Sequence, residues 1–196
     1  MKMKMTTTFL AAAVVATALP GPAHAQSFDG ADIEGFIAVI EGMEALADKY
    51  DGAEYAGQRD LIQDQMNVGA GDFGTLLDED GQFRIFRLST DAMAAAGDIA
   101  PARDYRALVK ANGFDGLSDF GASADAIMMA WMATQVDPAD LAEMEAMAPE
   151  VMAMMPTGVR EQMAGVMRLA QAIENVPAED VAALKPYEKR LDKAFD

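Results

Sequence analysis

The side chains with the most distinctive chemistry in this sequence are the thioethers of its methionines, which gather in one stretch. Residues 111–159 contain eight methionines and eight acidic residues but no lysine or arginine. Thioethers are soft ligands that bind Cu(I), and they still coordinate where histidine and cysteine are absent. Met152, Met154 and Met155 lie within four positions of one another, so they form the candidate Cu(I) or other soft-metal site.

The same stretch also suits a binding surface for apolar molecules. Methionine side chains are flexible and repack around ligands of different shape, and acidic, Met-lined grooves accept amphipathic helices. The predicted ligand-binding residues surround the only tryptophan and are Met128, Trp131, Met132, Met144, Met147 and Met155. The expected ligand is a small apolar molecule or a basic, amphipathic partner helix. A purely structural or interaction protein with a Met-filled core stays open as the third interpretation.

Most nucleophilic and acid–base catalysis lacks the residues that it needs. The chain has no cysteine and one histidine, His24, which lies in a segment that we expect to be removed. Neither a Ser-His-Asp triad nor a Cys-His pair can then be built. A two-carboxylate glycosidase stays open because there are 32 acidic residues, but the chain offers no cluster of aromatic residues on which sugars would stack. Binding rather than catalysis is therefore the expected activity.

The first 25 residues have the pattern of a cleaved secretory signal peptide. Lys2 and Lys4 precede an apolar run over residues 9–19, and the sequence before the expected cleavage point is Ala-His-Ala. A membrane anchor would need about 18 apolar residues, more than this run supplies. Cleavage after Ala25 would leave Gln26 as the first residue of a periplasmic or secreted protein.

The strongly acidic balance excludes two classes of partner. The formal net charge is −17, and loss of the two lysines in the leader would lower it to −19. Nucleic acids and anionic membrane surfaces attract proteins through Lys and Arg, so neither is an expected partner. The longest apolar run after the leader covers residues 126–133, whereas a bilayer span needs roughly 20 residues.

The spacing of apolar residues predicts the elements that must position these side chains. The clearest stripes at helical spacing cover residues 30–50, 101–109, 120–135 and 159–173. We expect an all-α fold, an irregular bundle of seven or eight short helices in one acidic domain over residues 26–196. Residues 75–88 contain a turn cluster and fit either a small β-hairpin or a loop that leads into a helix.

Overall fold

The computed structural model describes residues 28–58, 76–78, 81–137, 139, 154 and 156–195. Within these ranges the chain is helical and contains no β-strand, which confirms the predicted all-α bundle of short helices. In chain order the helices are α1 (Gly30–Lys49), η1 (Ala53–Tyr55), α3 (Ile85–Ala95), α4 (Ala100–Ala111), α5 (Leu117–Gln135), α7 (Thr157–Glu174), α8 (Ala178–Leu184) and α9 (Glu188–Phe195). No helix in the described ranges is long and apolar enough to cross a membrane. The leader lies outside these ranges, so export stays a prediction.

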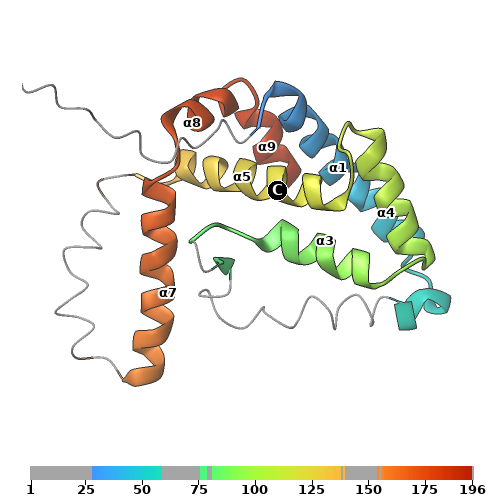
Figure 1. The fold of residues 1–196 in the computed structure, drawn as a ribbon, viewed down its shortest axis with the longest axis horizontal. Helices are drawn as coiled ribbons and strands as arrows, with labels where there is room; N and C mark the ends of the chain where they lie inside the picture. The colour runs from blue at the N-terminus through green and yellow to red at the C-terminus, as the bar shows by residue number, and fades with distance from the viewer. Residues whose placement is uncertain are drawn as a thin grey trace, which may run out of the picture.

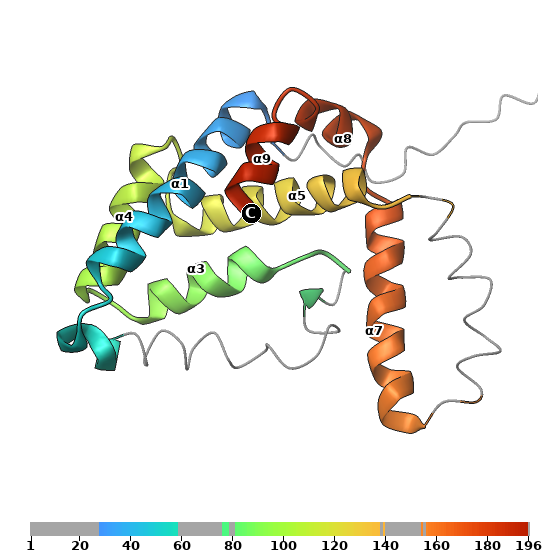
Figure 2. The same cartoon turned by 180° about the vertical axis from the view of Figure 1, so that it is seen from behind.

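Helix α5 runs through the middle of the molecule and contacts most of the other helices. Figure 1 shows α1, α8 and α9 along one side of α5 and α3 along the other, and Figure 2 shows the same arrangement from behind. Helices α4 and α7 meet its two ends. Phe120, Ala124 and Ile127 of the predicted stripe are completely buried, as is Ala130, whereas Met128 and Trp131 are half-buried.

Helix α1 begins directly after its N-cap residue, Asp29. The carboxylate of Asp29 accepts hydrogen bonds from the N–H groups of Ala31 at 2.7 Å and Asp32 at 3.1 Å. The carboxylate of Asp32 accepts in return from the N–H of Asp29 at 2.7 Å. This capping box satisfies N–H groups that have no partner within the helix. Ile33 and Phe36, on the face that follows, are buried in the core.

Phe120 lies at the centre of an aromatic cluster. Its ring centroid is 5.0 Å from that of Phe114, 6.1 Å from those of Phe86 and Tyr105, and 6.2 Å from that of Phe36. All of these pairs except the stacked one with Phe36 are edge-on. Aromatic pairs in such arrangements contribute roughly 0.5–1.5 kcal/mol each beyond the area that they bury. The cluster therefore joins α1, α3, α4 and α5, which are distant in the sequence, into one core.

The segment before α3 resolves the choice between a hairpin and a loop that leads into a helix. Leu77 and Phe83 pair in a single antiparallel bridge, and no longer ladder forms among the described residues. Gly81, in the turn between them, has a φ of +76°, in the left-handed region that favours glycine. Helix α3 then begins at Ile85. The loop-and-helix alternative is confirmed, and the hairpin is reduced to one bridge.

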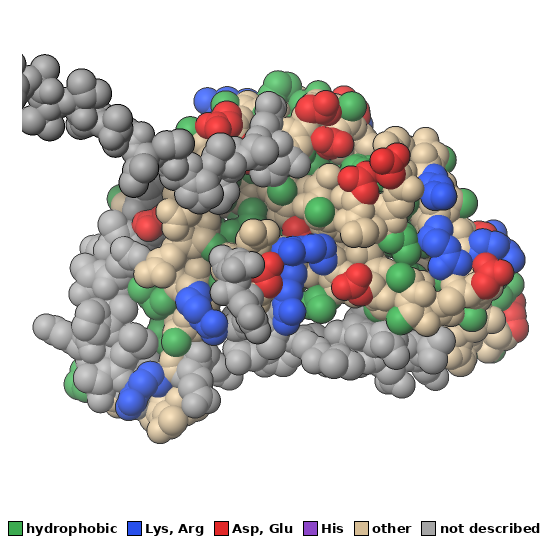
Figure 3. Space-filling view, in the orientation of Figure 1, with side chains coloured by type: hydrophobic (Ala, Val, Ile, Leu, Met, Phe, Trp, Pro, Cys, Tyr) green, Lys and Arg blue, Asp and Glu red, His purple; other side chains and the backbone are tan. Residues whose placement is uncertain are grey.

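Acidic and basic side chains stand beside one another on the face shown in Figure 3. Among the described residues three arginines make ion pairs at 3.1–3.6 Å, which are Arg87–Asp78, Arg103–Asp104 and Arg106–Asp98. Arg103–Asp104 and Arg106–Asp98 each include an exposed side chain, and such pairs contribute about 0–1 kcal/mol each. The stability of the fold therefore comes mainly from its apolar and aromatic core.

Tyr105 of α4 buries a hydroxyl that has no hydrogen-bond partner among the described residues. Its side chain is 3% exposed, and burial raises the pKa of the phenol. Because Tyr105→Phe keeps the ring and removes an unpaired polar group, we expect the free energy of unfolding to stay constant or rise by up to about 1 kcal/mol. Urea denaturation measures this change.

Tyr50→Phe is the matched control for this substitution. The hydroxyl of Tyr50 donates to Asp104 at 2.6 Å, so its removal should lower the free energy of unfolding. If Tyr105→Phe destabilised the protein as much as the control, the hydroxyl of Tyr105 would have to be paired in solution.

Candidate ligand-binding groove

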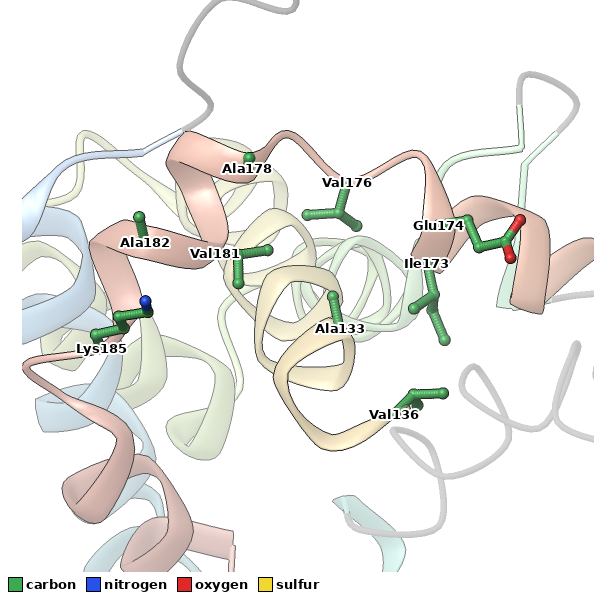
Figure 4. A pocket seen from close by; sticks show the side chains of 9 residues that line it. All are labelled: Ala133, Val136, Ile173, Glu174, Val176, Ala178, Val181, Ala182 and Lys185. Atoms are coloured by element: carbon green, nitrogen blue, oxygen red, sulfur yellow. The ribbon is translucent and has the colours of Figure 1, made fainter. Parts of the chain in front are cut away.

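An apolar groove lies where the C-terminal ends of α5 and α7 meet α8 (Figure 4), and its volume is about 490 Å³. Its lining residues are Ala133, Val136, Ile173, Glu174, Val176, Ala178, Val181, Ala182 and Lys185. All of them except Glu174 and Lys185 are aliphatic. Sites for small molecules typically enclose about 300–1,000 Å³ and are mostly apolar. The groove therefore has the size and the chemistry of such a site.

The short connection between α7 and α8 brings the walls of this groove together. Helix α7 ends at Glu174, and the N–H of Val176 closes its last turn on the carbonyl of Ile173 at 3.2 Å. Pro177, with φ −57° and ψ 134°, then precedes α8. Because proline has a fixed φ and no N–H, it suits the start of a helix. The chain changes direction within three residues, so Ile173 and Val181 line the same groove.

Small side chains keep the groove hollow. Ala133 on α5 and Ala178 and Ala182 on α8 each contribute only a methyl group to the lining. Ala178 and Ala182 are exposed, so the groove opens to solvent along α8. Val176 packs against the main core, which contains Phe120, and against a smaller apolar cluster formed by Leu77, Phe83 and Met129. The wall that contains Val176 is therefore continuous with the core.

The two charged lining residues lie at opposite ends of the groove. Figure 4 shows the amine of Lys185 turned toward Val181, whereas the carboxylate of Glu174 points away from the aliphatic side chains. Both charged residues are exposed. The groove thus has an aliphatic interior with one cation at its α8 end.

Met128 and Met132, two of the predicted ligand-binding residues, lie in the apolar cluster next to the groove. They are half-buried and pack against Leu77, Phe83 and Met129. Ile173 and Val176 belong both to this cluster and to the lining of the groove. Met128 and Met132 thus belong to the same apolar cluster as part of the lining but are not themselves lining residues.

Trp131, the centre of the predicted region, packs against the main core and the C-terminal helix. Its ring centroid lies 5.1 Å from that of Phe195, and its Nε1 donates to the carboxylate of Asp192 at 3.4 Å. Both partners belong to α9. Trp131 is half-buried and is not one of the residues that line the groove.

Of the remaining predicted site residues, the structure describes only Met154. Met144, Met147, Met152 and Met155 lie outside the described residues. Met154 is described, and it is 82% exposed. In the described part of the chain no group of three or more carboxylates or histidines could hold a metal ion. A thioether site for Cu(I) stays a prediction.

A buried carboxylate in the middle of α5 was missed by the sequence reasoning. Asp125 is 3% exposed and accepts hydrogen bonds from the N–H groups of Phe86 at 2.7 Å and Arg87 at 3.2 Å. These are free N–H groups in the first turn of α3, whose own N-cap residue, Arg84, makes no side-chain capping bond. Asp125 therefore caps α3 from a neighbouring helix.

The guanidinium of Arg87 completes this cluster. Its Nε donates to Asp125 at 2.8 Å, and a second nitrogen pairs with Asp78 at 3.1 Å. Burial raises the pKa of Asp125, while the hydrogen bonds from Arg87 and Phe86 oppose that rise. None of these residues lines the groove. The only signal in the sequence is that Asp125 stands between Ala124 and the apolar run over residues 126–133. We assign a stabilising role to this cluster.

A second polar cluster ties the end of α1 to α4. The amine of Lys49 lies 2.5 Å and the hydroxyl of Tyr50 2.6 Å from the same oxygen of Asp104. These hydrogen bonds, with that of Lys49 the larger, lower the pKa of Asp104 to about 2. The carboxylate is held in its charged form as a partner for α1, which is a structural role.

The groove is therefore the candidate ligand-binding site, because of its volume and its aliphatic lining. No protein-family model, curated protein or solved structure matches this chain.

Proposed function

We propose that this protein binds a small apolar molecule in the groove between α5, α7 and α8. The supporting observation is the aliphatic lining, which leaves about 490 Å³ of hollow space open to solvent. Moving apolar surface from water into such a groove is favourable by roughly 25 cal/mol per Å². The walls are held by helices that pack on the core, so little conformational entropy is lost on binding.

The dimensions of the groove favour a small molecule over a partner helix. A docked helix uses anchors at positions i, i+3, i+4 and i+7, which need a continuous apolar strip of about two turns. Here Glu174 and Lys185 border the aliphatic lining at its two ends. The apolar contact is therefore short.

Filling the groove should abolish binding. In Ala133→Leu the longer side chain enters the space beside Val136 and Val181, so we expect the affinity of the full chain for the neutral dye N-phenyl-1-naphthylamine to fall about tenfold or more. Ala122→Leu makes the same change at an exposed position of the same helix and should leave the affinity unchanged. Titration followed by dye fluorescence measures both variants.

A series of linear alcohols from hexanol to decanol should displace the dye. Each methylene that enters the groove contributes roughly 0.8 kcal/mol, about fourfold in affinity, until the groove is full. Equal dye affinity in Ala133→Leu and the unchanged protein would contradict the groove as the site. Absence of any dye or alcohol binding would contradict the proposed function itself.

A further inference from the structure

Resting on the proposed function, we propose that Lys185 selects ligands with an anionic head, so that the groove takes linear aliphatic carboxylates. The aliphatic part of such a ligand would lie among Val136, Ile173 and Val181, which come from three different parts of the fold. Its carboxylate would lie at the α8 end, beside Lys185. The ligand is thereby defined by both its chain and its charge.

Lys185 is placed to receive an anion. It follows the last residue of α8, where its N–H donates to the carbonyl of Ala182 at 3.3 Å. Among the described residues no carboxylate forms a salt bridge with its amine. The amine is exposed, and Figure 4 shows it turned toward Val181. A carboxylate there could stay partly hydrated while its chain is buried.

The opposite end of the groove sets the orientation of the ligand. Glu174 lies there and would repel a second anion, although its carboxylate points away from the lining. The net charge of −17 also repels anions at long range. Salt screens this field over about 8 Å at physiological ionic strength, so a cation in contact with the head group dominates. An exposed ion pair changes affinity by up to about fivefold.

Three ligands with the same chain and different heads test this inference. Decanoate, decanol and decyltrimethylammonium are each titrated against the dye-loaded full chain and its Lys185→Gln variant. We expect the substitution to weaken decanoate about three- to fivefold, to leave decanol unchanged, and to strengthen the ammonium ligand about twofold. Lys189→Gln removes an exposed lysine that does not line the groove, and it should change none of the three affinities.

The titrations distinguish a failure of the anionic selectivity from a failure of the proposed function. If Lys185→Gln leaves all three affinities unchanged, the groove stands and the anionic selectivity is overturned. If the ammonium ligand binds best and Glu174→Gln weakens it, the selectivity has the opposite sign and the inference is again overturned. If none of the three displaces the dye from the unchanged protein, the proposed function fails with it.

Discussion

Replacing Asp125 with alanine should lower the free energy of unfolding by about 3–5 kcal/mol, because it removes a buried carboxylate that accepts hydrogen bonds from three donors. The N–H groups of Phe86 and Arg87 would lose their partner at the start of α3, and the Arg87 guanidinium would lose its buried counter-ion. A urea denaturation curve followed by far-UV circular dichroism measures the loss.

Two further variants separate the contributions within this cluster. Asp125→Asn keeps one acceptor oxygen for Phe86 but turns its NH₂ group toward the donors of Arg87, so we expect an intermediate loss of about 1–3 kcal/mol. Asp119→Ala removes an exposed carboxylate from the same helix, which accepts a single hydrogen bond from the N–H of Asp115 at 3.0 Å, and should cost about 1 kcal/mol. Equal losses from Asp125→Ala and Asp119→Ala would contradict the role of Asp125 as the cap of α3.

Gly35→Ala should be the second most damaging substitution, with a loss of about 1–3 kcal/mol in the free energy of unfolding. A Cβ atom on Gly35 would lie 2.4 Å from the backbone oxygen of Asn112 and 3.0 Å from the ring of Phe114. Backbone cannot rotate away as a side chain can, so α1 would have to separate from the end of α4. The gain in helix propensity, about 1 kcal/mol for glycine to alanine, is too small to offset this.

Gly42→Ala is the matched control on the same helix. Its Cβ would lie 2.7 Å from a terminal methyl carbon of Leu108, which is the far end of a flexible side chain. Leu108 can change rotamer, so we expect the free energy of unfolding to change by less than about 1 kcal/mol in either direction. Thermal and urea denaturation of both variants compare a backbone clash with a side-chain clash. Similar values for the two would show that the end of α4 yields as easily as Leu108 does.

Local signals in the sequence predict most of the helices correctly. The buried stripe of α1 and the stripe around Phe120 depend on neighbours within one or two turns, and the spacing of apolar residues reflects those neighbours directly. The segment before α3 was ambiguous because a run of alternating residues fits both a strand and the start of a helix. A partner on α5 decides it, since Asp125 supplies the capping bonds.

The groove could not be predicted because it is a space left between small side chains of different helices. Large, distinctive side chains give the clearest signals in the sequence, and they point to Met128, Trp131 and Met132. Two of these, Met128 and Met132, lie in the cluster beside the groove. Ala133 and Ala182 carry no periodic or chemical signal, and their importance appears only when α5 and α8 meet. The position of Trp131 depends likewise on a helix about sixty residues away.

The contact between Trp131 and α9 makes the intrinsic fluorescence of the protein a reporter of the position of α9. The chain contains one tryptophan, so its intrinsic emission has a single source. That indole lies against Phe195 and Asp192 and is not part of the groove lining. A red shift would therefore register the detachment of the final helix, while occupancy of the groove could be followed separately through an added fluorophore. The emission of Trp131 and the emission of the added fluorophore, measured together, would then show whether ligand binding and the attachment of the C-terminal helix are coupled.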